Sequence, residues 1–188
     1  MEKIKLGPKA VYPYPMPMAL VGATVDKKPN FLAVAWLSRV NMTPPIMAVS
    51  LGRKSYTLPA IEKNGVFSIC FPGIDLMEEA DFCGIYSGLE TDKSNLFNIF
   101  FGQLEAAPMI KECPLCMECK LVQTVELQTN NLYLGEIVAA YAEERYMTGG
   151  KLDISKMNAF VLTMPDNNYW KVGHHMGKAW DMGRHLFG

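Results

Sequence analysis

Residues 30–57 read NFLAVAWLSRVNMTPPIMAVSLGRKSYT, and this stretch decides the fold class. Apolar and β-branched residues dominate Phe31–Leu37 and again Ile46–Leu51, which predicts two strands with buried side chains. A polar turn and a Pro-Pro corner separate the two runs, and a residue that precedes a proline is pushed toward an extended conformation. The basic and hydroxyl-bearing cluster Arg53–Thr57 follows the second strand and leads into a predicted helix.

The neighbouring segments extend this pattern. Ala19–Val25 is a further apolar run, and the turn-like residues 26–30 join it to the next strand as a β-hairpin. The segment Ser55–Asn64 has helical character, with Thr57 as the expected N-cap and Gly65 as the expected stop. Val66–Phe71 then predicts a fourth strand.

The second half of the chain is also rich in predicted strands. Asp75 and Glu78 resemble a capping box that opens a helix through about Ile85. Two long β-rich runs, 117–128 and 132–146, flank Thr129-Asn130-Asn131, a pattern typical of a hairpin, and 157–163 is a further strand. Six or seven strands with short connections favour an antiparallel barrel, and the missing G-x-G-x-x-G fingerprint argues against a dinucleotide-binding sheet.

Bulk composition narrows the class of protein. The 188 residues are expected to form one domain, 1–188, and 49% hydrophobic residues suffice for a core. A net charge of −1 disfavours nucleic acid as a partner, and no apolar run is long enough to span a membrane. No secretory signal pattern is present, so we expect a cytoplasmic protein whose five cysteines are reduced thiols.

The opening stretch also predicts a ligand. Two cations and three hydroxyls gather in Arg53–Thr57, where backbone N–H groups at a helix start are expected to be free to bind an anion such as a phosphate. The strand before it is apolar and carries Trp36, which offers a flat surface for a ring. A phosphate at one end and a flat ring at the other are the features of flavin mononucleotide (FMN).

The order of these motifs resembles the flavin reductase-like family of FMN-binding split barrels, and within it the flavoredoxin-type members. This resemblance implies a mainly β fold, a six-stranded antiparallel Greek-key split barrel with a few flanking helices. It also implies a homodimer in which each flavin lies at or near the subunit interface. Outside residues 30–57 the similarity rests on Cys83–Gly88, Asp92-Lys93, Glu118–Leu121, Leu134–Val138 and Tyr169-Trp170 with Gly173.

The resemblance assigns roles to particular positions. The cluster after the second strand would hold the FMN phosphate and ribityl chain, and the Trp36 region would lie against the ring. A lysine would meet either the phosphate or the N1–C2=O edge of the reduced flavin, where a cation is stabilising. The expected cofactor-binding residues are Asn30, Trp36, Leu37, Ser38, Arg53, Lys54, Ser55, Thr57, Ser87 and Lys93.

We therefore expect a flavin-dependent oxidoreductase whose bound FMN supplies the chemistry. No G-x-S-x-G elbow, H-E-x-x-H motif or carboxylate pair is evident, so no side chain is predicted to be catalytic. Two mechanisms fit: NAD(P)H reduces the flavin, or the flavin carries electrons from a redox protein such as ferredoxin. The extended phosphate cluster and Lys93 favour a tightly bound FMN with NAD(P)H oxidation as a further activity, and the sequence does not name the electron donor.

Two other readings remain open at this point. The spacing of Cys113, Cys116 and Cys119 occurs in iron–sulfur proteins, but a fourth ligand is not evident and buried packing is the commoner role, so no metal is predicted. A non-flavin binding module on the same barrel is the second alternative. His174 and His175 lie in an aromatic tail, where packing or surface exposure is the expected role.

Overall fold

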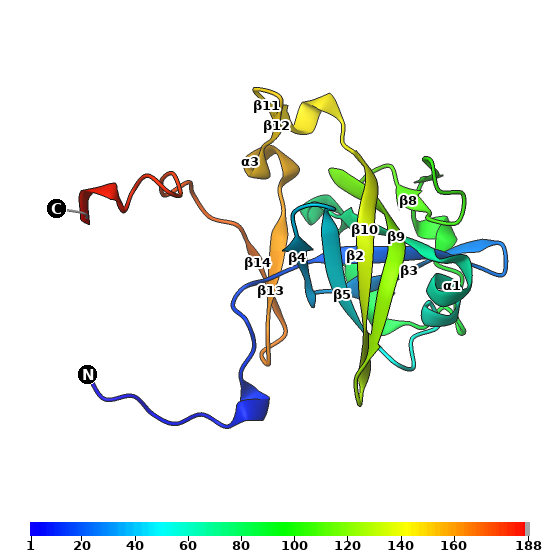
Figure 1. Cartoon of the computed structure of the whole chain (residues 1–188), viewed down its shortest axis with the longest axis horizontal. Coiled ribbons are helices and arrows are strands. Elements are labelled where there is room, and N and C mark those ends of the chain that lie inside the picture. The colour runs from blue at the N-terminus through cyan, green and yellow to red at the C-terminus, as the bar shows by residue number, and fades with distance from the viewer. Residues whose placement is uncertain (187–188) are drawn as a thin grey trace.

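Seven antiparallel strands form the main sheet of the protein, which we describe for residues 1–186 from a computed structural model (Figure 1). The sheet curls into a barrel. Near one edge of this sheet the backbone N–H of Ser50 donates to the carbonyl oxygen of Trp36 at 2.9 Å. This confirms the predicted mainly β, antiparallel architecture, with one strand more than the six expected. In spatial order the strands are β3 (Lys28–Val34), β2 (Ala19–Val25), β6 (Val66–Phe71), β9 (Leu115–Glu126), β10 (Asn130–Tyr141), β5 (Ile46–Gly52) and β4 (Leu37–Asn41).

The strands bury side chains on both faces of the sheet. Val21 of β2 packs inside the barrel with Phe67 and Tyr133, whereas its neighbour Leu20 packs on the outer face with Phe31. Successive side chains of a strand point to opposite faces, so a strand that is covered on both faces is apolar throughout. This explains why the sequence shows continuous apolar runs rather than strict alternation.

Two helices cover parts of this barrel. Helix α1 (Leu58–Asn64) ends at Gly65, whose φ of +67° and N–H bond to the Ile61 carbonyl oxygen confirm the predicted stop. Thr57 lies at the N-cap position, but its side chain does not cap the helix. Helix α2 (Met77–Ile85) packs against β3. The predicted cap at Asp75 is wrong, because Asp75 lies within a preceding 3₁₀ turn (Ile74–Leu76) and α2 begins after it.

The β9–β10 hairpin confirms the predicted pairing of the two long runs, but its strands begin and end at other residues than predicted. The turn lies at residues 127–129, and the N–H of Leu127 donates to the Asn130 carbonyl oxygen at 2.9 Å. Strand β10 stops at Tyr141, before the predicted end, because a 3₁₀ turn follows at Glu144–Tyr146. The strand predicted at 157–163 is observed only at Phe160–Thr163 (β13). Before it the chain forms α3 (Ile154–Met157) and then Asn158, which has φ of +50°.

The remaining elements are short. Strands β1 (Met16–Pro17), β13 and β14 (Asn168–Lys171) form a three-stranded sheet. Two further pairs are β7 (Ile99–Phe100) with β8 (Met109–Ile110), and β11 (Met147–Thr148) with β12 (Lys151–Leu152). The other 3₁₀ turns are η1 (Pro8–Ala10), η3 (Ser94–Leu96) and η5 (Arg184–Leu186).

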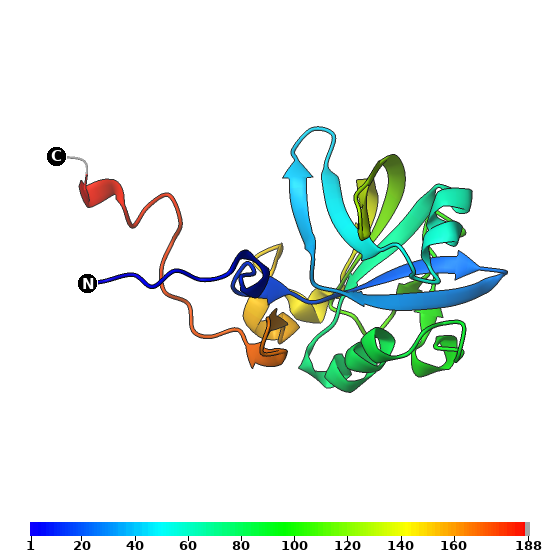
Figure 2. The ribbon, with the colours of Figure 1, turned by 90° about the horizontal axis from the view of Figure 1, so that it is seen from below.

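The ends of the chain leave the barrel on one side (Figures 1 and 2). Figure 2 also shows the β4–β5 hairpin and α2 on opposite sides of the barrel. None of the helices within residues 1–186 is both long and apolar enough to cross a membrane.

Candidate functional site

A cavity of about 710 Å³ opens between the β5–α1 connection, the end of α2 and the tip of the β9–β10 hairpin. Gly52 and the cluster Arg53–Thr57 form one wall, and Gly84–Gly88 form another. Gln128 and Thr129 contribute from the hairpin. Seven of the ten expected cofactor-binding residues line this cavity: Asn30, Arg53, Lys54, Ser55, Thr57, Ser87 and Lys93.

Asn30 and Thr57 join two walls of the cavity. Both are buried, and the Asn30 side-chain amide donates to the Thr57 hydroxyl at 2.8 Å. This bond replaces the helix cap expected of Thr57. Gly88 lies so close that a Cβ atom there would meet the Asn30 Oδ1 atom and the Tyr56 ring. Only glycine therefore allows the loop after α2 to lie against this wall.

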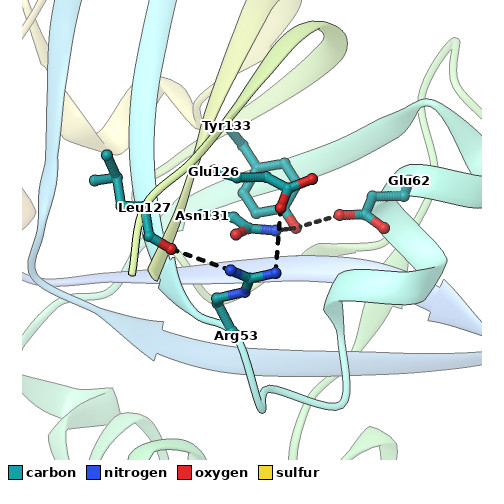
Figure 3. Close-up of polar contacts among 6 residues, drawn as sticks. All are labelled: Arg53, Glu62, Glu126, Leu127, Asn131 and Tyr133. Atoms are coloured by element: carbon teal, nitrogen blue, oxygen red, sulfur yellow. Dashed lines mark hydrogen bonds and ion pairs between the residues drawn. The ribbon is translucent and has the colours of Figure 1, made fainter. Parts of the chain in front are cut away.

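Arg53 is bound to the hairpin (Figure 3). Its guanidinium donates to the Leu127 carbonyl oxygen at 3.3 Å and pairs with the Glu126 carboxylate at 3.2 Å. The side chains of Arg53 and Glu126 are 48% and 69% exposed. An ion pair this exposed contributes only about 0–1 kcal/mol, so it restrains the guanidinium weakly.

Part of the expected anion-binding backbone is already occupied. The N–H groups of Arg53, Ser55 and Leu58 donate to the carbonyl oxygens of Thr129, Gly52 and Ser55 at 2.9–3.2 Å. The prediction of a row of free N–H groups is therefore wrong for these three residues. The donors and positive charge that this wall presents to an anion therefore come largely from side-chain cations and hydroxyls.

Lys93 is a buried cation at the cavity wall. It is 2% exposed, and its Nζ atom donates to the carbonyl oxygens of Phe31 and Cys83, both at 3.0 Å. An ammonium carries three N–H donors, so one remains beyond these two bonds. No carboxylate within residues 1–186 forms an ion pair with Lys93, and burial lowers its pKa. A ligand that brings an acceptor or a negative charge would stabilise this lysine.

The remaining three expected residues lie outside this cavity. Trp36 is 44% exposed and stacks at a tilt on Tyr12, with 6.2 Å between ring centroids, so it is not a core tryptophan. Leu37 and the exposed Ser38 begin β4, where they pair with Val49 and Ala48 of β5. The structure thus separates these three from the other seven, and their role against a flavin ring stays a prediction.

A polar network of the buried residues Asn131 and Tyr133 with the exposed Glu62 lies beside Arg53 (Figure 3). The Tyr133 hydroxyl donates to the Glu62 carboxylate at 2.7 Å and accepts from the Asn131 side-chain amide at 3.3 Å. Burial and the neighbouring carboxylate raise the pKa of Tyr133 to about 12. The sequence analysis missed this network. Its signal is polar Asn131 at an inward-facing, period-two position of β10 beside buried Tyr133.

The cysteines do not converge as their spacing suggested. Cys116 and Cys119 lie three residues apart on β9 and therefore point to opposite faces of the sheet. Cys113 and Cys116 join the outer cluster together with Cys70, whereas Cys119 packs inside the barrel. Within residues 1–186 no three His, Cys, Asp or Glu side chains are arranged so that they could hold a metal ion, so the structure does not support the metal site of the alternative reading.

Comparisons with known proteins give consistent matches. Residues 11–153 match the model of the family described as flavin reductase like domain. The crystal structure of flavoredoxin from Methanosarcina acetivorans is similar, with a TM-score of 0.96 and 48% identity over 99% of this chain and 100% of that one. Flavoredoxin of Desulfovibrio vulgaris (Miyazaki F) has a TM-score of 0.90 and 33% identity over 97% and 100% of the two chains. An FMN-binding protein from Thermus thermophilus shares the fold, with a TM-score of 0.79 and 23% identity over 95% and 99%.

Proposed function

We propose that this chain, which belongs to the flavin reductase-like domain family, binds FMN in the 710 Å³ cavity and transfers electrons through it. The observation that carries the proposal is a buried lysine, Lys93, that forms no ion pair within residues 1–186 and lies in the wall of a cavity that also holds a cation and hydroxyl cluster. The similarity to two flavoredoxins supports the flavin, and the FMN-binding protein with the same fold supports its mononucleotide form.

The residues present fit such a cofactor. Arg53 and Lys54 supply positive charge for a phosphate, and Ser55 and Thr57 supply hydroxyls. Lys54 forms no ion pair within residues 1–186, and the pair made by Arg53 is weak because it is exposed. The remaining N–H of Lys93 suits an oxygen or nitrogen acceptor on the ligand.

Bound FMN would supply one- and two-electron redox chemistry that side chains lack. The protein's part is then to bind, orient and tune it. Lys93 would favour states of the ligand that carry negative charge, because a buried cation is stabilised by a nearby anion. Asn30 and Thr57 would fix the wall through their mutual bond, and the loop at Gly88 would exclude water from that side.

Trp36, Leu37 and Ser38 would then meet the ring from outside the cavity. Leu37 and Ser38 begin the edge strand β4, and the exposed Trp36 precedes it, which is compatible with a flavin that lies at the surface between two subunits. We therefore include a homodimer in the proposal. Trp36, Leu37 and Ser38 would then contact the flavin together with residues of a partner copy, rather than with residues of their own chain alone.

The direct test is a binding titration. Purified protein is expected to show a flavin absorption band, or to quench the fluorescence of added FMN with one site per chain. Protein that lacks the band and does not bind FMN at micromolar concentrations would overturn the proposal.

A second experiment identifies the electron donor. Stopped-flow absorbance of the FMN-loaded protein is recorded after mixing with NADH, NADPH or reduced ferredoxin. We expect a bound-flavin oxidoreductase, so at least one of these donors should bleach the flavin band. Rapid bleaching by a nicotinamide indicates a reductase, whereas bleaching by ferredoxin alone indicates an electron carrier.

A further inference from the structure

Three of the five cysteines, Cys70, Cys113 and Cys116, lie together in the outer core cluster. Cys70 of β6 is directly opposite Cys116 of β9 in the antiparallel ladder. Residues opposed in this way have Cβ atoms about 4.5–5.5 Å apart. Cys113 joins the pair through a turn, because its backbone N–H and the Cys116 thiol both donate to the Ile110 carbonyl oxygen, at 3.2 Å each. Two cysteines that are three residues apart are thereby held at one oxygen atom.

The three thiols also bond to one another. Burial disfavours a thiolate at Cys70, but hydrogen bonds with Cys113 and Cys116 outweigh burial and lower the pKa of Cys70. The thiolate is the nucleophilic form of cysteine. Its charge reaches Cys113 when the S–H proton of Cys113 moves to Cys70 along the bond between them. The cluster therefore supplies a nucleophile more readily than a lone buried thiol does.

A cavity of about 470 Å³ adjoins this cluster, and both Cys113 and Cys116 line it. The exposed fractions of these two residues are 4% and 1%, whereas that of Cys70 is 0%. Cys113 is therefore the member most open to a reagent from solvent. Its small exposed fraction admits only a small reagent.

The other walls of the cavity favour an uncharged reagent. Phe100, Tyr141 and Ala142 supply apolar surface, and Lys111 and Glu143 bring opposite charges. The two charges offset one another, so the cavity has no strong attraction for an anion or a cation. A hydroperoxide is small and uncharged at neutral pH, and it is a common oxidant of cysteine.

We propose that Cys113 and Cys116 react with a hydroperoxide and form a reversible disulfide. The Cys113 sulfur attacks the O–O bond and keeps one oxygen as a sulfenic acid, while the other oxygen leaves with the thiol proton as an alcohol or water. Cys116 then attacks the Cys113 sulfur, so the S–S bond forms, the S–O bond breaks, and the hydroxyl leaves with the Cys116 proton as water. The two thiols thus lose two electrons to the peroxide. Exchange with two equivalents of a low-molecular-weight thiol restores them.

The test is a thiol count after native protein has met hydrogen peroxide. Protein is reduced with dithiothreitol, separated from it, incubated for hours with hydrogen peroxide, blocked with iodoacetamide in guanidinium chloride and digested with trypsin. We expect the five free thiols per chain to fall by two, to three, and to return to five with dithiothreitol. Tryptic peptide 112–120 contains Cys113, Cys116 and Cys119, so the expected product has one internal disulfide and a single alkyl group, at Cys119.

Three variants assign the roles within the site. Cys119→Ser is the matched control, since this cysteine is on the same strand but packs inside the barrel, and the variant should still lose two thiols. Cys113→Ser should lose thiols at least tenfold more slowly than the wild type. In Cys116→Ser, dimedone added with the peroxide should trap the sulfenic acid at Cys113.

Other results would overturn the proposal. A peptide map that joins Cys70, in peptide 64–93, to peptide 112–120 would refute the assigned pair. Thiol loss that needs guanidinium chloride, or that is equally fast in Cys113→Ser, would refute the site. If Cys113→Ser fails to fold, the map of the wild type still decides. The site does not rest on the proposed flavin function, because a thiol count does not require that FMN binds.

Discussion

Lys93 holds its Nζ atom between the carbonyl oxygens of Phe31 and Cys83, which belong to β3 and α2. A single side chain thereby links two elements that both reach the cavity. The same contact that fixes the loop after α2 also places a cation beside the proposed cofactor. Substitution of Lys93 can separate its structural role from its role in binding.

Lys93→Met is predicted to weaken FMN binding at least tenfold. The free energy of unfolding should change by less than about 2 kcal/mol, because relief of the buried charge offsets the loss of two hydrogen bonds. Lys28→Met is the matched control, since this lysine is exposed and paired with Asp92. Fluorescence titration and urea unfolding measure the two quantities. Equal FMN affinity in wild type and Lys93→Met would contradict a cofactor role for Lys93.

Tyr133→Phe should change how stability depends on alkaline pH. An ordinary tyrosine loses its proton near pH 10, whereas Tyr133 keeps it to about 12 when folded. Between these values the unfolded chain binds fewer protons, so the stability of the wild type falls by up to about 1.4 kcal/mol per pH unit from this group. The variant lacks this contribution, although it is about 1 kcal/mol less stable at pH 7.

Urea unfolding at pH 7, 10, 11 and 12 checks this difference. Tyr86→Phe, which removes a half-exposed hydroxyl, should retain the wild-type dependence. A Tyr133→Phe variant whose stability falls as steeply as the wild type above pH 10 would show that Tyr133 does not hold its proton in the folded state.

At the scale of elements, α1 is short and depends on its ends. Its first turn receives no side-chain cap, and Gly65 closes it in the left-handed region. Gly65→Ala should lower the free energy of unfolding by about 1–2 kcal/mol through backbone strain alone, because no atom lies within 4 Å of the added Cβ. Gly65→Asn should lose less, since asparagine tolerates this conformation. Thermal unfolding of the two variants measures this difference. Equal loss of stability in Gly65→Ala and Gly65→Asn would argue against backbone strain as the cause.

The strands could be predicted because their residues carry the signal locally. The predicted strand Phe31–Leu37 overlaps β3, which runs from Lys28 to Val34, and Ile46–Leu51 falls within β5; both predictions rest on apolar side chains. Strand β4 was wrongly predicted as a turn, because its polar residues are exposed at the edge of the sheet. The helix caps could not be predicted in this way. The Thr57 hydroxyl looked like a cap, but Asn30, 27 residues earlier, occupies it from the neighbouring strand.

The residues of the candidate site differ in the same way: some could be predicted from the sequence alone and others could not. Arg53–Thr57 is contiguous, so its basic and hydroxyl-bearing character was visible in the sequence. Lys93 was found by resemblance, but its two carbonyl partners come from distant segments and needed the fold. Trp36–Ser38 lie outside the cavity, because the chain leaves β3 there to begin the edge strand β4. The Asn131 and Tyr133 network was missed because its members are polar residues among apolar ones.

At the scale of the whole molecule, every cysteine is buried. Their exposed fractions range from 0% to 4%, and all five are free thiols. This burial shields all five sulfur atoms from large reagents. It also raises the pKa of Cys83 to about 11 and of Cys119 to about 12, whereas at Cys70 hydrogen bonds with Cys113 and Cys116 outweigh burial and lower the pKa. Native protein should therefore react with less than one equivalent of Ellman's reagent within minutes, and with five equivalents in guanidinium chloride. Rapid reaction of a thiol in native protein would contradict this packing.

Direct pairing of β6 with β9 has a consequence for how such a protein can diverge. Residues 66–71 bond to 115–120, so the ladder is complete without anything that lies between them. The intervening residues 72–114 leave the main sheet between these two strands, and they include α2, Ser87, Gly88 and Lys93. One wall of the cavity thus comes from a segment between two paired strands, and the other, at Arg53–Thr57, directly follows strand β5. Replacement of residues 72–114 would therefore alter what surrounds the ligand and leave the β6–β9 register in place.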